Sequence, residues 1–254
     1  MGVVAVTGSA GGIGGAIKDR IESAGHKVIG VDVRDAEVIA DLSLAEGRLA
    51  AIDDITAQSG DALDGLVVAA GIGGSTAAPP SMVARINYFG AAELLVGLRD
   101  RLPNGELKAA VAIASNSATA VPMDDMSLVE ACLSGDEDEA AKVADTLDGE
   151  AVYAMSKLAL GRRVRQLAVE WAPGVRVNAV APGPVLTPLT EAALQHPVTG
   201  DLIRQYPIPL DRWGEKAEIA EAVWFLLSPQ SSWTTGSILF VDGGTDALLN
   251  PERL

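Results

Sequence analysis

Cysteine is nearly absent from this chain of 254 residues, in which Cys132 is the single example. A disulfide within the chain needs two cysteines, so none can form, and this composition is typical of proteins in a reducing compartment. We therefore expect a cytoplasmic location. No apolar run approaches the roughly 20 residues of a membrane-spanning helix, and no basic leader precedes the apolar residues 2–6. The sequence predicts neither a membrane segment nor a signal peptide.

Histidine and basic residues are also scarce. The two histidines, His26 and His196, have no ligand-type partners at a useful spacing, so we expect no metal site. Against 34 Asp and Glu residues stand only 19 Lys and Arg, which gives a formal net charge of −15. Such an acidic chain argues against nucleic acid and anionic membranes as partners.

What is present is a regular alternation of short apolar segments and amphipathic stretches. Expected strands cover residues 2–7, 27–32, 65–70, 109–114, 175–180 and 237–241. Expected helices cover residues 12–24, 45–58, 81–101, 151–171, 188–205 and 215–227. Strands that are apolar on both faces and alternate with helices form a parallel sheet covered on both sides. The length fits one domain, so we predict a single α/β domain of the doubly wound, Rossmann type over residues 1–254.

One segment, residues 119–150, interrupts this alternation. Within 124–150 there are ten acidic residues and one basic residue, Lys142. We expect an acidic helical insertion here, directly ahead of the helix that begins near residue 151.

The first expected strand runs into a glycine-rich turn, residues 7–14, that reads Thr-Gly-Ser-Ala-Gly-Gly-Ile-Gly. A tight turn, a close approach to a pyrophosphate and a helix packed on its strand each exclude a side chain, which explains Gly8, Gly12 and Gly14. The phosphates of a dinucleotide would then meet free N–H groups around Ile13 at the helix start. A tight turn without a ligand is the alternative, and the strand–turn–helix context favours the binding site.

Asp32 ends the second expected strand. A carboxylate there can accept hydrogen bonds from both ribose hydroxyls of adenosine and would repel a 2′-phosphate, so NAD is favoured over NADP. Arg34 is the contrary feature, because it could pair with a phosphate. A simple strand-end turn residue is the other reading of Asp32.

Two further pairs follow later strands. Asp41 and Leu42 are expected to border the adenine ring, with the Asp41 side chain near the exocyclic amine. Ala70 and Gly71 end the third expected strand, where small residues let the backbone contact a dinucleotide. Ordinary strand-end residues are the alternative for both pairs.

Tyr153 and Lys157 are four residues apart in an expected helix, so both side chains project from one face. A phenol is a poor base at neutral pH, but a neighbouring ammonium and a positive nicotinamide would lower its pKa. Tyr153 could then exchange a proton with an alcohol or a carbonyl. This spacing also occurs by chance in many helices, and its weight comes from its position one crossover beyond a strand that ends in a serine.

That serine is Ser115, whose hydroxyl would face the cleft at the carboxyl end of a parallel strand and hold the substrate oxygen. Ser117 is the rival for this role. Asn87 lies inside an expected long helix, where its amide could order a water that links Lys157 to solvent. The alternative for Asn87 is a helix irregularity bonded to its own backbone.

The turn that includes Pro182, Gly183, Val185 and Thr187 follows another expected strand. It could place backbone groups and the Thr187 hydroxyl against a nicotinamide carboxamide. Residues 188–210 after it carry four prolines and are expected to form a mobile lid over the substrate. An ordinary proline-rich surface loop is the alternative.

In order and spacing, these motifs and the Val-Asp-Gly-Gly of residues 241–244 resemble the short-chain dehydrogenases/reductases over essentially the whole chain. Within that family, the chain resembles the bacterial 3α-hydroxysteroid dehydrogenases/carbonyl reductases. The resemblance lies in residues 31–42, in the segment 87–91 and in the insertion at 119–150. The resemblance implies a seven-stranded sheet, reversible oxidation of secondary alcohols with NAD, and transfer of the pro-S hydride. It suggests steroids or non-steroid ketones and aldehydes as substrates.

The chain departs from the family pattern at two places. Ala114 precedes the reactive Ser115 where a serine pair is usual, and Asn116 follows it. The lid sequence also differs, which bears on the substrate.

The insertion has consequences for assembly. A homodimer or homotetramer is expected, and in most family members the helices near residues 81 and 151 pair across a dimer axis. An acidic insertion could cover that surface and redirect a dimer to residues 205–245. A solvated acidic flap without a role in assembly is the alternative.

Three functions compete on the sequence. The leading one is an NAD(H)-dependent oxidoreductase that interconverts secondary alcohols and ketones. The second is a 3-oxoacyl-thioester reductase or another alcohol dehydrogenase on the same scaffold. Asp32 argues against the thioester reductase, because that chemistry usually uses NADPH. The third is a non-catalytic dinucleotide sensor, which has little need for a complete Ser–Tyr–Lys group.

Overall fold

The protein is described by a computed structural model over residues 2–195 and 199–252. One sheet of seven parallel strands runs through its centre in the order β3-β2-β1-β4-β5-β6-β7. The strands are β1 (Val3–Thr7), β2 (Lys27–Asp32), β3 (Val38–Ile39), β4 (Gly65–Val68), β5 (Ala109–Ile113), β6 (Arg176–Pro182) and β7 (Ile238–Val241). The direction of winding reverses between β1 and β4, so the predicted doubly wound fold is confirmed.

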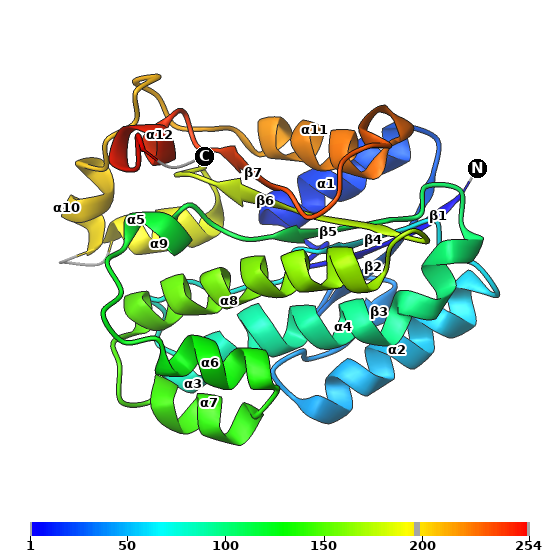
Figure 1. The fold of residues 1–254 in the computed structure, drawn as a ribbon, viewed down its shortest axis with the longest axis horizontal. Helices are drawn as coiled ribbons and strands as arrows, with labels where there is room; N and C mark the ends of the chain where they lie inside the picture. Colours follow the sequence, from blue (N-terminus) through cyan, green and yellow to red (C-terminus); the bar gives the residue numbers. More distant parts are fainter. Residues whose placement is uncertain (1, 196–198, 253–254) are drawn as a thin grey trace.

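Helices cover both faces of the sheet (Figure 1). On one face lie α1 (Gly12–Ser23) and α11 (Lys216–Leu227), and on the other lie α2 (Ala45–Ser59), α4 (Ala91–Leu98) and α8 (Gly149–Glu170). Successive residues of β1 serve the two layers, because Val4 and Val6 belong to the core under α1 and α11 while Ala5 belongs to the other. This explains why the strands are apolar on both faces.

The remaining elements are shorter. They are α3 (Pro80–Ala84), the π-helical η1 (Arg85–Gly90), the 3₁₀ turn η2 (Arg99–Asn104), α5 (Ser117–Ala120), α6 (Ser127–Ser134), α7 (Glu137–Ala144), α9 (Pro188–Gln195), α10 (Thr199–Arg204), η3 (Pro229–Ser231) and α12 (Thr245–Leu249). No helix in residues 2–195 and 199–252 is long and apolar enough to cross a membrane.

Three elements differ from the sequence-based expectation. The predicted helix at 81–101 changes type three times: α3 passes into the π-helical η1, η1 into α4, and α4 into the 3₁₀ turn η2, which contains Pro103. The predicted helix at 188–205 is two helices in the described residues, α9 and α10. The sequence missed β3, because two residues are too short to show an alternating pattern.

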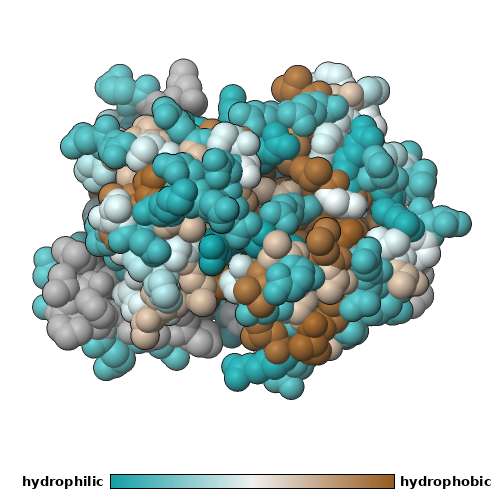
Figure 2. All heavy atoms as spheres, turned by 90° about the horizontal axis from the view of Figure 1, so that it is seen from below, coloured by the Kyte–Doolittle hydropathy of each residue, from teal (hydrophilic) through white to brown (hydrophobic). Residues whose placement is uncertain are grey.

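The acidic insertion folds largely into α6 and α7, which pack against α3 and α8 below the sheet (Figure 1). Viewed from this side, the surface is mostly polar with apolar side chains gathered in one area (Figure 2). Exposed apolar side chains here include Leu49 on α2 and Val96 on α4. The insertion therefore covers part of the surface that α3 and α8 would otherwise expose.

The glycine-rich turn gives a test of the local fold. A Cβ on Gly14 would lie 2.1 Å from the Gly8 carbonyl oxygen, whereas a Cβ on Gly11 in the same turn meets no atom within 4 Å. We expect Gly14→Ala to lower the free energy of unfolding by about 1–3 kcal/mol, a fall of roughly 2–4 °C in melting temperature per kcal/mol. Gly11→Ala is the control and should melt within about 1 °C of the parent. Equal melting temperatures for both variants in thermal unfolding would contradict this account of the turn.

Candidate functional site

A cleft of about 470 Å³ opens at the carboxyl ends of the strands, where the winding reverses between β1 and β4. This is the place where open α/β sheets bind ligands, and the volume lies within the usual range for ligand pockets. The predicted cofactor-binding residues all line it: Gly8, Gly12, Ile13, Gly14, Asp32, Asp41, Leu42, Ala70, Gly71, Tyr153, Lys157, Pro182, Gly183, Val185 and Thr187. Ser115 lines the same cleft.

The glycine-rich turn forms one wall of the cleft. Gly8 has φ +70°, and a Cβ there would lie 2.9 Å from the Ala70 Cα on the next wall. Gly12 has φ +57°, and a Cβ there would meet no atom within 4 Å, so open space lies over the start of α1. No side chain caps this helix start. Free N–H groups beside open space form a site that suits an anion.

Asp32 stands at the end of β2 beside this turn. One carboxylate oxygen accepts a hydrogen bond from the Ala10 N–H at 3.0 Å and the other from the Val33 N–H at 2.8 Å. A carboxylate has about four acceptor positions, so Asp32 keeps capacity for ribose hydroxyls. Arg34 lines the same part of the cleft.

Asp41 and Leu42 follow β3 and lie next to the end of β2, since the Ala40 N–H donates to the Asp32 carbonyl at 2.9 Å. Asp41 Oδ1 accepts hydrogen bonds from the backbone N–H of Ser43 at 2.9 Å and from its hydroxyl at 2.7 Å, which fixes the turn. Leu42 is buried, with 6% of its surface exposed. The expected contact of the Asp41 side chain with an adenine amine would have to use its second oxygen.

Tyr153, Ser115 and Lys157 meet at the far end of the cleft. Tyr153 lies in the first turns of α8, whose start is capped by Asp148 through a hydrogen bond from the Ala151 N–H at 2.9 Å. The Ser115 hydroxyl lies close enough to the Tyr153 phenol to lower the pKa of that phenol. The Lys157 ammonium lies 5.9 Å from the centre of the Tyr153 ring and donates to the Ile113 carbonyl at 2.9 Å. The three predicted groups are therefore brought together.

Ser117 holds Ser115 through two hydrogen bonds. Its hydroxyl donates to Ser115 Oγ at 3.0 Å and its N–H to the same oxygen at 3.2 Å. Ser115, in contrast to Ser117, lines the cleft, so the geometry favours Ser115 of the two rivals.

Burial dominates the electrostatics of this group. It raises the pKa of Tyr153, the hydrogen bond with Ser115 opposes the rise, and the charge of Glu150 adds to it. Burial lowers the pKa of Lys157 to about 8. Among the protein's own groups, desolvation of the phenolate outweighs the favourable contacts of Tyr153, and the sequence-based prediction of a lowered pKa applies to the site with a positive nicotinamide beside it.

Asn87 lies in the π-helical η1 and is fully buried. Its amide forms a reciprocal pair with the Ile72 backbone, accepting from the N–H and donating to the carbonyl, both at 2.9 Å. A Cβ on Gly71 would lie 3.0 Å from Asn87 Oδ1 and 3.4 Å from Lys157 Nζ. The amide thus holds the wall of the cleft next to Lys157, and its partner is Ile72 rather than its own helix.

The turn after β6 leads into α9. Thr187 is buried, and its hydroxyl lies 3.1 Å from that of Thr190, which donates to the Val185 carbonyl at 2.6 Å. Thr190 also lines the cleft, and sequence reasoning missed it. Its position three residues after Thr187, in the first turn of an expected helix, was the available signal. Apolar lining residues that reasoning also missed are Ile72, Ile86 and Ile113.

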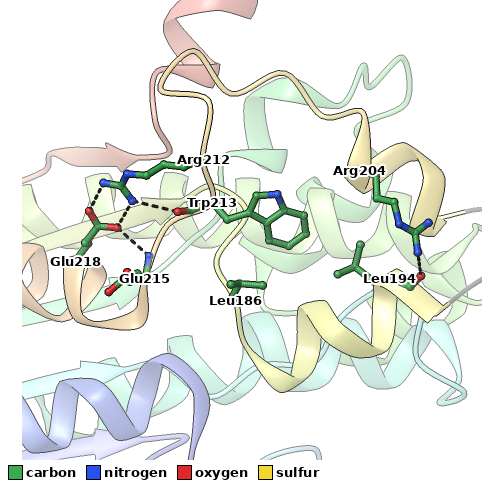
Figure 3. Close-up of a pocket in the computed structure, with 7 residues that line it drawn as sticks. All are labelled: Leu186, Leu194, Arg204, Arg212, Trp213, Glu215 and Glu218. Atoms are coloured by element: carbon green, nitrogen blue, oxygen red, sulfur yellow. Dashed lines mark hydrogen bonds and ion pairs between the residues drawn. The ribbon is translucent and has the colours of Figure 1, made fainter.

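A second hollow, a groove of about 730 Å³, lies beside this turn. Its apolar lining is Leu186, Leu194 and Trp213, and Figure 3 shows the indole of Trp213 facing the groove between the other two. Arg212 forms a two-point ion pair with Glu218 at 2.9 and 2.6 Å, which lowers the pKa of Glu218 to about 2. The groove is therefore apolar in the middle, with charged side chains at its edges.

His26 does not line the cleft. His26 packs against Trp224, with ring centroids 5.5 Å apart, and His196 lies outside the described residues. In the part of the chain that the structure describes, no group of three or more His, Cys, Asp or Glu side chains could hold a metal ion.

Comparisons with known proteins agree with this geometry. A family model described as enoyl-(acyl carrier protein) reductase matches residues 139–246. The 3-alpha-hydroxysteroid dehydrogenase/carbonyl reductase of Comamonas testosteroni is 41% identical over 257 residues, covering 100% of both chains.

Solved structures extend the likeness to three dimensions. The crystal structure of the 3-alpha-hydroxysteroid dehydrogenase from Pseudomonas sp. B-0831 complexed with NADH is 44% identical, with a TM-score of 0.96 over 99% of this chain and 100% of the other. The aldohexose dehydrogenase of Thermoplasma acidophilum is 26% identical, with a TM-score of 0.76 over 100% of this chain and 95% of the other. With a full-length relative at 41% identity, the chain belongs to the short-chain dehydrogenase/reductase family.

Proposed function

We propose that this protein is an NAD(H)-dependent oxidoreductase that interconverts secondary alcohols and ketones. The observation that carries the proposal is the meeting of Tyr153, Ser115 and Lys157 in a cleft that the open start of α1 also lines. The Pseudomonas relative, crystallised with NADH, supports the same cofactor. The direct test is an NADH-oxidation screen over ketosteroids, quinones, aromatic aldehydes and acyl thioesters, repeated with NADPH.

The residues divide into those that bind and those that act on the proton. The N–H groups at the start of α1 would hold the pyrophosphate, Asp32 the adenosine ribose, and Lys157 the other ribose. A bound nicotinamide would supply the acceptor or donor of the hydride. Tyr153 takes the proton of the substrate hydroxyl during oxidation and returns it during reduction. Ser115 donates a hydrogen bond to the substrate oxygen and stabilises charge there.

The groove beside the turn at 185–187 suggests where the substrate body lies. Its apolar wall of Leu186, Leu194 and Trp213 suits an extended apolar ketone or alcohol, and a steroid meets that description. The lid role of residues 188–210 belongs to this proposal, because α9 and α10 carry two of the groove residues, Leu194 and Arg204. A short acyl thioester would use this wall less, so the substrate screen separates the two classes.

The location and assembly proposed are a cytoplasmic homodimer or homotetramer. The insertion packs on α3 and α8, and Trp233, between α11 and β7, is fully exposed. These features support pairing through residues 205–245. Cross-links between α4 and α8 of two copies would contradict that arrangement.

The first prediction concerns the phenol. Tyr153→Phe should lower kcat/KM for ketone reduction by about 10³-fold while the Kd for NADH stays within about twofold, because the ring remains and only the proton donor is lost. Steady-state NADH oxidation and fluorescence titration measure the two quantities. Ser115→Ala should cost about 100-fold and its matched control Ser117→Ala less than about tenfold. A fully active Tyr153→Phe protein would remove the proposed mechanism.

The second prediction concerns the choice of cofactor. Asp32→Asn keeps an oxygen acceptor for the Ala10 N–H but removes the charge that would repel a 2′-phosphate. The ratio of kcat/KM with NADH to that with NADPH should fall by at least about tenfold, which corresponds to about 1.4 kcal/mol. Asp35→Asn, in the following turn, is the control and should leave the ratio unchanged. An unchanged ratio in Asp32→Asn would assign the preference to other residues.

The third prediction follows from the pKa of Lys157, which burial lowers to about 8. The side chain is charged below that pH and neutral above it, and the negative pyrophosphate of NADH favours the charged form. Binding should therefore raise the pKa and take up a fraction of a proton near about pH 8.5, and none near about pH 6.5, where the ammonium is already charged. Calorimetric titration in two buffers of different ionisation enthalpy measures this uptake. Lys157→Met should abolish it, and proton release by the parent protein would contradict it.

A further inference from the structure

Arg48 is a buried cation that joins three parts of the chain. It lies in the first turns of α2, and its side chain has 0% of its surface exposed. A buried guanidinium requires partners because its desolvation is costly. It also sits near a helix start, where a positive charge is unfavourable. Its position therefore depends on the groups that surround it.

Those groups come from distant segments. Arg48 Nε donates to Glu93 on α4 at 2.6 Å, and Nη2 donates to Glu137. Glu137 is the first residue of α7 in the acidic insertion, and it also pairs with Arg85 at 3.3 Å. Burial lowers the pKa of Arg48, but the two carboxylates outweigh it and hold the pKa above its usual value. The insertion thus supplies one of two anions that keep this cation buried.

The same guanidinium contacts a residue that lines the cofactor cleft. Arg48 Nη1 donates to the carbonyl of Leu42 at 3.2 Å, and Leu42 lines the cleft at the edge beside Asp41. The backbone is crowded there, since a Cβ on Gly47 would lie 2.1 Å from the Asp41 carbonyl oxygen and one on Gly90 would lie 3.2 Å from Leu42 Cβ. A shift of Arg48 would therefore move the wall of the cleft.

We propose that Glu137 and Arg48 are positioning residues for the adenosine half of the dinucleotide, so that the acidic insertion sets cofactor affinity. The inference rests on the proposed cofactor site and adds a role for a segment that none of the proposed chemical steps uses. Without its charge on Glu137, the guanidinium reorients toward Glu93 and solvent, and the Leu42 carbonyl loses its donor. Tyr153 and Ser115 lie at the other end of the cleft and stay in place.

The experiment separates the two halves of the dinucleotide. Glu137→Gln should raise the Kd for NADH and for AMP by the same factor, about five- to tenfold. The Kd for reduced nicotinamide mononucleotide, which lacks adenosine, and kcat at saturating NADH should change less than about twofold. Glu139→Gln on the same helix is the control, since the Glu139 side chain is exposed and pairs with the exposed Lys142 at 3.6 Å, and it should match the parent in every measurement.

A double-mutant cycle tests the route through Arg48. Arg48→Met replaces the buried cation with an apolar side chain, a change that buried ionic groups often tolerate. Glu137→Gln should have little further effect on the Kd for AMP in that background. If Glu137→Gln does not fold, Glu93→Gln removes the other anion and must show the same selective loss.

The outcomes are distinct. An unchanged Kd for AMP in Glu137→Gln, or an equal loss for AMP and for the mononucleotide, would overturn the positioning role while leaving the oxidoreductase intact. A parent protein that binds neither NADH nor AMP would instead overturn the proposed function.

Discussion

Lys157 joins the two elements that carry the proposed catalytic hydroxyls. Its buried ammonium donates to the carbonyl of Ile113, the last residue of β5, two residues before Ser115. One turn earlier on the same helix stands Tyr153. A buried charge without a partner is costly, so α8 cannot slide along β5 without losing this bond. Together with the buried face of α8, this hydrogen bond holds the register between helix and strand in which Tyr153 and Ser115 meet.

The same burial explains the direction of both pKa shifts. Desolvation favours the neutral phenol of Tyr153 and the neutral amine of Lys157. With a pKa of about 8, Lys157 is still mostly charged near neutral pH, while burial keeps the Tyr153 phenol neutral, so the protein's own groups do not form an ammonium–phenolate pair. A ligand with negative charge would raise the pKa of Lys157, so that the amine keeps its charge above about pH 8. Charge state and ligand binding are coupled in this arrangement, a relation that a reading of the residue types alone did not reach.

Much of the fold could be predicted because its signals are local. A few consecutive residues are enough to recognise the apolar strands, the glycine-rich turn, and the pair Tyr153 and Lys157 on one helix. What the sequence could not give depends on contacts between distant segments. The π-helical turn around Asn87 depends on Ile72, β3 is visible only through its pairing with β2, and the burial of Arg48 depends on a glutamate 89 residues away. The rise in the pKa of Tyr153 that burial causes could not be predicted for the same reason, since burial is a property of the assembled fold.

Thr7 satisfies backbone groups at the point where β1 and β4 separate to form the crevice. At the end of β1 its hydroxyl accepts hydrogen bonds from the N–H groups of Ala69 and Ala70 at 2.9 and 3.0 Å. Regular pairing of β4 with β1 therefore stops at Val68, yet the next two backbone donors are satisfied. Where the strands separate, a side-chain hydroxyl replaces the main-chain carbonyl as hydrogen-bond acceptor. The crevice can therefore stay open while the backbone N–H groups of Ala69 and Ala70 keep their partner. If a methyl group replaced this hydroxyl, the two N–H groups would lose their acceptor unless the strands moved together and narrowed the crevice.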